Sequence, residues 1–165
     1  MRAALLLAVL AVAPGAALGD FSGRVVKIAD GDTLTVLANK RHIRVRLAGI
    51  DAPEYNQAFG KQSRKSLAQL CARKDAQVVE RGKDVYGHTL GVVTCATVEA
   101  NSEQVRRGMA WAFKLYVPMG SALYELETYA RLRKIGLWAD ARPVAPWDWR
   151  RTHPPKPRKA QPPAS

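Results

Sequence analysis

Two short segments carry the acidic side chains that could perform chemistry. Residues 46–54 (RLAGIDAPE) place an arginine on a strand-like stretch and then Asp51 and Glu54 on either side of a rigid proline. Residues 30–33 (DGDT) add Asp32 in a turn-like sequence. Crowded carboxylates are unfavourable unless a cation lies among them. Asp32, Asp51 and Glu54 together therefore indicate a hard divalent cation with oxygen ligands.

Each segment taken alone has a simpler interpretation. A DGDT sequence between two strands is typical of a hairpin turn. An arginine on a polar strand face, or a glutamate after a proline, is usually an ordinary surface residue. The sequence argues against a zinc site, because its two cysteines, Cys71 and Cys95, belong to no Cys/His cluster at ligand spacing. Any metal would therefore be bound by oxygen.

The elements that must position these residues follow from hydrophobic periodicity. Alternation predicts strands, most clearly at 42–47 (HIRVRL), and helical spacing predicts an amphipathic helix at 57–73. Asn101 and Ser121 are N-cap candidates for two later helices. The predicted order is strands at 25–29, 34–38 and 42–47, a helix at 57–73, strands at 77–81 and 89–94, and two helices. This βββ-α-ββ-α-α order is typical of an α+β fold, and a small five-stranded barrel fits it.

The composition indicates one folded domain with an acidic partner. The chain has 165 residues, of which 47% are hydrophobic and 24% charged, values that argue against bulk disorder or a polytopic membrane protein. Lys and Arg number 26 against 14 Asp and Glu, giving a formal net charge of +12 and a pI near 10.2. A polyanion is the natural partner of so basic a chain.

The first 19 residues have a composition of their own. Arg2 precedes an uninterrupted apolar stretch at 3–13, and small residues follow before the first acid, Asp20. This pattern predicts a secretory signal peptide at 1–19, cleaved after Gly19. The alternative is a membrane anchor, but the apolar stretch is well short of the ~20 residues that span a bilayer. We therefore expect a secreted or periplasmic protein without a stable membrane anchor.

Export changes what the two cysteines are expected to do. Thiols that reach an oxidising compartment can pair and remain paired, so a disulfide between Cys71 and Cys95 becomes plausible. Two buried free thiols are the alternative, because the sequence does not show whether the two Cα atoms lie close enough to be bridged.

The C-terminal end changes composition again. Residues 150–165 are rich in proline and basic residues and predict a disordered, extended tail, which places the folded domain at 20–149. One interpretation is a solvated tail that aids solubility. The other is a polycationic arm that raises non-specific affinity for phosphate backbones.

Several motifs together resemble the staphylococcal nuclease (thermonuclease) family in its exported bacterial form. They are the DGDT turn, the RLAGIDAPE segment, DVYG at 84–87, NSEQVRRG at 101–108 and GLW at 136–138. The resemblance covers roughly residues 20–149. It implies a five-stranded OB-fold β-barrel with three helices. It also implies calcium-dependent hydrolysis of DNA and RNA phosphodiesters, with products that end in a 3′-phosphate.

The resemblance assigns roles residue by residue. Asp32 and Asp51 correspond to the calcium carboxylates, and Ala52 to a position that contributes its backbone carbonyl, where the family usually has threonine. Glu54 corresponds to the proposed general base for the attacking water, although positioning the water or ordering the loop are alternatives. Arg46 corresponds to the phosphate-binding arginine, whose planar fork suits two phosphate oxygens.

Two aromatic positions match the family pattern, and one nearby position departs from it. Tyr86 and Tyr116 correspond to residues that line the nucleotide pocket, with packing tyrosines as the alternative. After the Tyr86-Gly87 pair the family has an arginine that stabilises the transition state, whereas this chain has His88. Losing one preorganised donor typically lowers the rate by ~10²- to 10³-fold. The sequence therefore predicts a monomeric calcium-dependent nuclease, with a secreted nucleic-acid-binding module of weakened catalysis as the alternative.

Overall fold

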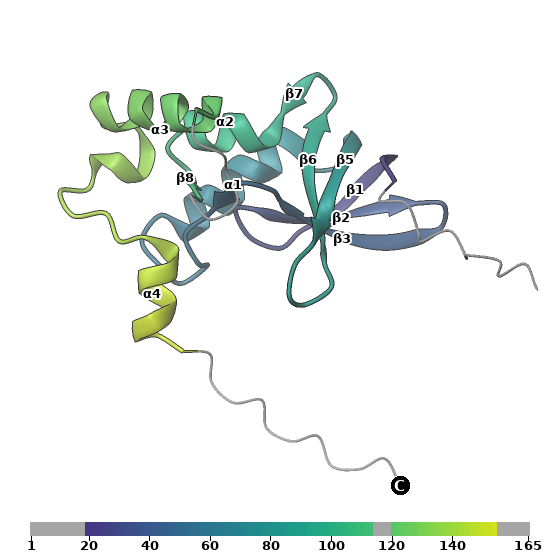
Figure 1. The fold of residues 1–165 in the computed structure, drawn as a ribbon, viewed down its shortest axis with the longest axis horizontal. Coiled ribbons are helices and arrows are strands. Elements are labelled where there is room, and N and C mark those ends of the chain that lie inside the picture. The colour runs from purple at the N-terminus through teal and green to yellow at the C-terminus, as the bar shows by residue number, and fades with distance from the viewer. Residues whose placement is uncertain (1–18, 114–119, 155–165) are drawn as a thin grey trace, which may run out of the picture.

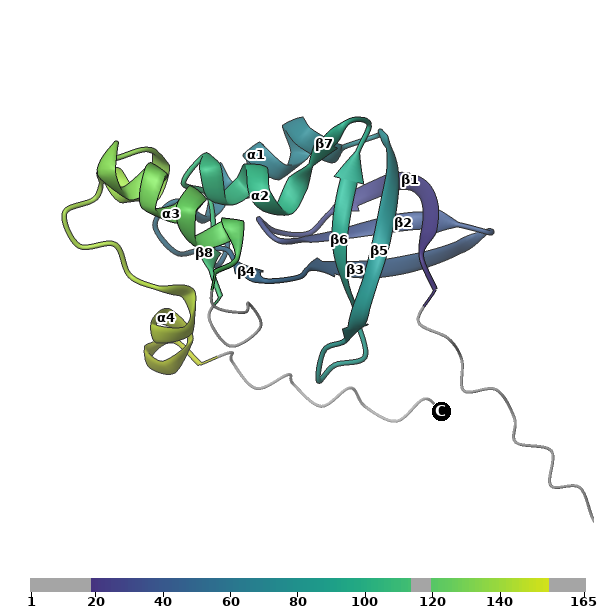
Figure 2. The same cartoon turned by 45° about the horizontal axis from the view of Figure 1, so that its top comes forward.

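The computed structural model describes residues 19–113 and 120–154. A five-stranded β-barrel forms the main part of the fold. Its strands are β1 (Phe21–Ile28), β2 (Thr33–Ala38), β3 (Arg41–Leu47), β5 (Asp75–Lys83) and β6 (Thr89–Cys95). They are hydrogen-bonded in the order β3-β2-β1-β5-β6, and a parallel pairing of β3 with β6 closes the sheet on itself. Figures 1 and 2 show the strands on one side of the molecule and most of the helices on the other. The predicted α+β fold with a five-stranded barrel is confirmed.

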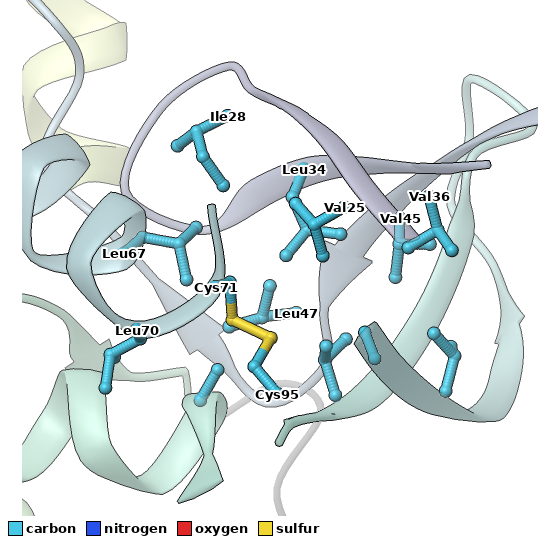
Figure 3. Close-up of a cluster of buried hydrophobic side chains, with 14 of the residues drawn as sticks. Val25, Ile28, Leu34, Val36, Val45, Leu47, Leu67, Leu70, Cys71 and Cys95 are labelled. Atoms are coloured by element: carbon cyan, nitrogen blue, oxygen red, sulfur yellow. A yellow bond between two sulfur atoms is a disulfide. The ribbon is translucent and has the colours of Figure 1, made fainter. Parts of the chain in front are cut away.

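Side-chain alternation along β2 and β3 decides what the barrel buries. Leu34 and Val36 on β2, and Val45 and Leu47 on β3, are at most 1% exposed and face the core shown in Figure 3. The intervening basic residues of β3 must then point outward, because successive side chains alternate between the two faces of a strand. The strand that fills the core thus also carries Arg46 to the outer surface.

Helices and short strands cover one end of the barrel. The helices are α1 (Gly60–Cys71), α2 (Ala100–Arg106), α3 (Ala122–Leu132), the 3₁₀ helix η1 (Gly136–Ala139) and α4 (Pro146–Thr152). The short strands are β4 (Ile50–Asp51), which pairs with β8 (Trp111–Ala112), and β7 (Val98–Glu99). Within the described residues, no helix is long and apolar enough to cross a membrane.

Of the two predicted helix caps, the one at α2 is wrong and the one at α3 is confirmed. Helix α2 begins directly after β7 with Glu99 at its N-cap, so Asn101 lies inside the helix. The Asn101 side chain is buried, where it accepts a hydrogen bond from the Val93 amide (2.9 Å) and donates to the Ala48 carbonyl (2.9 Å). A buried amide needs such partners, and here they tie α2 to β6. At α3, Ser121 is the N-cap as predicted.

The C-terminal boundary also differs from the prediction. Helix α4 runs through Thr152, so the domain boundary expected at residue 149 falls inside a helix, and the described residues hold one α-helix more than the three predicted. The helix is anchored by Trp147, whose ring centroid lies 5.5 Å from that of Trp111 and 5.5 Å from that of Phe113. This aromatic packing has no signature in local periodicity. The predicted tail beyond residue 154, and most of the predicted signal peptide, lie outside the described residues.

A disulfide joins the end of α1 to the end of β6. Cys71 and Cys95 are bonded through sulfur, with Cα atoms 5.2 Å apart, and both are at most 1% exposed. Figure 3 shows the bond among the core side chains. Of the two alternatives that the sequence left open, the structure has the pair.

Replacing both cysteines by alanine should lower the free energy of unfolding by about 2–4 kcal/mol, because the bridge closes a loop between residues 24 apart and restricts the unfolded chain. Denaturant titration of the oxidised protein, the reduced protein and the double variant measures the effect. Equal midpoints for all three would show that the bridge does not contribute to stability.

Candidate active site

One cavity of about 170 Å³ gathers nearly all the residues singled out in the sequence. Its lining includes Asp32, Arg46, Asp51, Ala52, Glu54, Tyr86 and His88. These residues come from the β1–β2 turn, from β3 and the segment after it, and from the β5–β6 connection. Tyr116, the remaining aromatic candidate, lies outside the described residues. The barrel thus brings together segments that are more than 50 residues apart in the chain.

The β1–β2 turn is fixed by close packing. A Cβ atom added to Gly31 would lie 1.8 Å from the Ser63 Oγ of α1, so only glycine allows the turn to approach the helix this closely. The buried Gln104 side chain donates a hydrogen bond from Nε2 to the Gly31 carbonyl (2.7 Å). These contacts hold the turn, and therefore Asp32, against α1 and α2.

Asp32 is a buried carboxylate whose two oxygens are both in use. Oδ1 accepts a hydrogen bond from the Thr33 hydroxyl (2.8 Å), and Oδ2 accepts one from the Ala52 amide (2.9 Å). The second bond ties the β1–β2 turn to the segment that carries Asp51. Asp30 lies beside it and accepts a hydrogen bond from the Asp32 amide (3.0 Å). Burial, together with the negative charge of Asp32, raises the pKa of Asp30 to about 7.

Asp51 lies between two guanidinium groups. Its side chain is 1% exposed; Oδ1 is 2.9 Å from Arg46 Nη2, and Oδ2 is 2.6 Å from Arg150 Nη2. Burial raises the pKa of Asp51, and hydrogen bonding to Arg150 opposes that shift. Pairing of β4 with β8 fixes the backbone, with Asp51 opposite Trp111 in the register.

Glu54 is the most exposed of the three carboxylates. Its side chain is 40% exposed, and Oε1 accepts a hydrogen bond from Arg150 Nη1 (2.8 Å). Its backbone amide donates to the Gln57 side-chain carbonyl (3.0 Å), which orders the segment that follows Pro53. The Glu54 carboxylate is therefore accessible to a water molecule.

Arg150 is the site residue that the sequence did not reveal. Its composition places it in the predicted basic tail, yet α4 carries its guanidinium onto Asp51 and Glu54, which lie 99 and 96 residues earlier in the chain. Hydrogen bonding to Asp51 raises the pKa of Arg150 further above its ordinary range, so the group is charged at every physiological pH. No local pattern could have identified it, since only tertiary packing of α4 brings it to the site.

The β5–β6 connection is organised by Asp84, to which the sequence assigned no role of its own. Its Oδ1 accepts hydrogen bonds from the amides of Tyr86 (2.9 Å) and His88 (2.8 Å), and its Oδ2 lies 3.0 Å from His88 Nδ1. Although desolvation opposes the shift, these hydrogen bonds hold the pKa of Asp84 below its ordinary value. The carboxylate therefore fixes the orientation of the imidazole beside the cavity.

A second cavity of about 590 Å³ adjoins the first. Both are lined by Arg46, Asp84 and Tyr86, and the larger one adds apolar side chains such as Leu90 and Phe113. Arg150 lines the larger cavity. An apolar hollow with cationic groups at its margin has the chemistry to hold a flat ring attached to a phosphate.

The arrangement of oxygen donors at the site determines whether it suits a metal ion. Across residues 19–113 and 120–154, no three carboxylate, imidazole or thiol groups converge closely enough to form a ready-made ion site. The carboxylates of Asp51 and Glu54 are nevertheless bridged by the cationic Arg150. A cation therefore already stands among these oxygens, and hard oxygen donors suit calcium. These carboxylates are therefore the groups that could hold such an ion.

Comparison with known proteins agrees with this geometry. The family model described as staphylococcal nuclease homologue matches residues 44–140. A micrococcal nuclease from Shigella flexneri is 46% identical over 87% of this chain and 88% of its own length. Protein ParB from Escherichia coli is 43% identical over 92% and 90%, and an uncharacterized endonuclease from Haemophilus influenzae is 49% identical over 78% and 72%.

The matched region contains the end of β3 with Arg46, the segment carrying Asp51 and Glu54, and the Asp84–His88 connection. The five-stranded barrel is the fold that the sequence motifs predicted. The chain therefore belongs to the staphylococcal nuclease family of phosphodiester hydrolases.

Proposed function

We propose that this protein is an exported, calcium-dependent nuclease that hydrolyses DNA, RNA or both and leaves 3′-phosphate ends. The observation that carries the proposal is the convergence of Asp32, Asp51 and Glu54 with Arg46 around one small cavity. The net charge of +12 supports a polyanionic substrate. Each chain contributes a complete set of these residues, so a monomer suffices.

Each side chain has a separate role in the proposed reaction. Asp32 and Asp51, with the Ala52 carbonyl, would hold calcium, which supplies Lewis-acid polarisation of a phosphoryl oxygen. Arg46 binds phosphate oxygens through its planar fork. Glu54 orients the attacking water and can accept its proton as the water oxygen bonds to phosphorus. The bond from phosphorus to the 5′-oxygen breaks, the leaving oxygen takes up a proton from solvent to become a hydroxyl, and the phosphate stays on the 3′ side.

His88 takes the position where the family has an arginine. Asp84 holds its ring by Nδ1 at 3.0 Å, and the residue lines the smaller cavity. With Nδ1 donating to Asp84, Nε2 of the imidazolium form can donate a hydrogen bond to a phosphate oxygen. The same observation favours the second candidate function, a secreted module that binds nucleic acid with weakened catalysis. Measured turnover separates the two.

Export is supported by two features of the chain. The signal-like composition of residues 1–19 motivates it, and the buried Cys71–Cys95 disulfide is typical of proteins that mature in an oxidising compartment.

The purified protein should cleave single- and double-stranded nucleic acid in calcium and lose that activity in a chelator. End-group analysis of the products should find 3′-phosphates, because the 5′-oxygen is the leaving group. Tight binding of nucleic acid without calcium-dependent cleavage would select the binding-module alternative.

The substitutions Asp32→Ala, Asp51→Ala, Glu54→Gln and Arg46→Ala should each lower kcat by about 10²- to 10³-fold, the typical loss when one preorganised group is removed. Asp75→Asn and Arg24→Ala are matched controls, since these paired residues are largely exposed and lie outside the cavity. Circular dichroism and thermal unfolding verify the fold. Rates within a few-fold of wild type for all four variants would contradict the proposed site.

Intact-mass measurement of the exported protein should find a mature N-terminus near Asp20, because small residues at 17 and 19 suit a signal-peptidase site. Retention of residues 1–19 would overturn the export proposal without affecting the assignment of the active site.

A further inference from the structure

We propose that Arg150, carried by α4, is a second phosphate-binding arginine of the active site. The inference rests on the proposed function, since it assigns Arg150 to the same reaction. Of the site residues predicted from the sequence, only Arg46 carries a guanidinium. His88 stands where the family has a second one. The structure supplies another guanidinium from the C-terminal helix.

The two guanidinium groups share one carboxylate. Arg46 Nη2 lies 2.9 Å from Asp51 Oδ1, and Arg150 Nη1 lies 3.2 Å from the same oxygen. Arg150 Nη2 binds the other oxygen of Asp51 at 2.6 Å. A phosphate bound by Arg46 would therefore lie within reach of Arg150.

Arg150 also has the exposure that a substrate contact requires. Its side chain is 39% exposed, while its partner Asp51 is 1% exposed, so the guanidinium forms the accessible edge of the pair. It lines the 590 Å³ cavity together with Arg46 and Tyr86. Phosphate oxygens are acceptors of the same kind as carboxylate oxygens, and a planar fork binds either in a bidentate manner.

The position of Arg150 is set by packing around β8. Trp111 stands opposite Asp51 in the β4–β8 pairing, and its indole packs against Trp147 of α4 at 5.5 Å between ring centroids. The Gln57 Nε2 donates to the Val144 carbonyl just before the helix (2.7 Å). The residue paired with Asp51 thus also anchors the helix that delivers Arg150, and Figures 1 and 2 both show α4 as a separate helix outside the barrel.

The neighbouring Arg151 gives a matched control on the same helix. It has the same charge, forms an ion pair with Asp148, and is 77% exposed. Neither cavity at the site is lined by it. Any effect of general positive charge on nucleic-acid binding should therefore appear in both variants, whereas an effect on the reacting phosphate should appear only at position 150.

The decisive experiment compares Arg150→Ala, Arg150→Lys and Arg151→Ala in the full protein. Arg150→Ala should lower kcat by about 10²-fold or more, Arg150→Lys should recover part of that loss, and Arg151→Ala should stay within about 3-fold of wild type. Binding of a nucleoside 3′-monophosphate, measured by calorimetry in a chelator, should weaken about 10-fold in Arg150→Ala only. This readout needs neither metal nor turnover.

The double variant Arg150→Ala/His88→Arg tests whether positions 88 and 150 supply the same guanidinium contact to phosphate. The gain in kcat from His88→Arg should be smaller in wild type, where Arg150 already supplies the second guanidinium, than in a protein that lacks Arg150. In the Arg150→Ala background the same change should restore activity by about 10-fold or more. Equal gains in the two backgrounds would show that the positions act independently and would overturn the proposal.

Two further outcomes are equally clear. If Arg150→Ala cleaves faster than wild type and binds calcium more tightly, Arg150 competes with the cation for the carboxylates of Asp51 and Glu54, and the proposal fails. If wild type shows no calcium-dependent cleavage, the proposed function fails instead. The nucleoside 3′-monophosphate titration still judges Arg150 in that case, because equal affinities for wild type and Arg150→Ala would refute it alone.

Discussion

The buried carboxylate of Asp51 is the interaction on which the arrangement of the site depends. An ionised carboxylate that is 1% exposed is strongly unfavourable unless it is paired and hydrogen-bonded. Arg46 reaches it from β3 and Arg150 from α4. A requirement for charge compensation at one buried residue therefore brings the barrel and the C-terminal helix to the same place.

This requirement extends to the neighbouring acids. Burial and then the charge of Asp32 raise the pKa of Asp30 to about 7, because ionising a second buried carboxylate beside the first is unfavourable. Arg46 lies 3.7 Å from Asp32 as well as 2.9 Å from Asp51, so one cation serves two carboxylates. Such a cluster favours ligands that bring further positive charge, and it leaves both arginines close to any phosphate that enters.

The sequence predicted the strands and the candidate carboxylates because both lie in short, continuous segments, whereas the closed barrel and the residue roles followed from the resemblance to the family. Alternation along residues 42–47 identifies an inward and an outward face, and the DGDT and RLAGIDAPE motifs carry their carboxylates in short, continuous segments. Asn101, Asp84 and Arg150 were misjudged or missed for a common reason. Their roles depend on distant partners: a strand backbone for Asn101, loop amides and a histidine for Asp84, and a carboxylate 99 residues away for Arg150. Periodicity and composition contain no information about such pairings.

The packing around β8 explains how a residue so late in the chain can be positioned accurately. The Ala112 amide donates to Glu127 Oε2 of α3 (2.8 Å), and the Arg131 guanidinium stacks over Trp111 (4.8 Å to the ring centroid). Strand β8 is therefore held by α3 on one side, by β4 on another, and by Trp147 of α4. Any displacement of β8 would shift Asp51 and Arg150 together, because both are fixed relative to Trp111. Distance along the chain is thus no obstacle to precision, since the backbone of Trp111 pairs with that of Asp51 while its indole packs against the helix that carries Arg150.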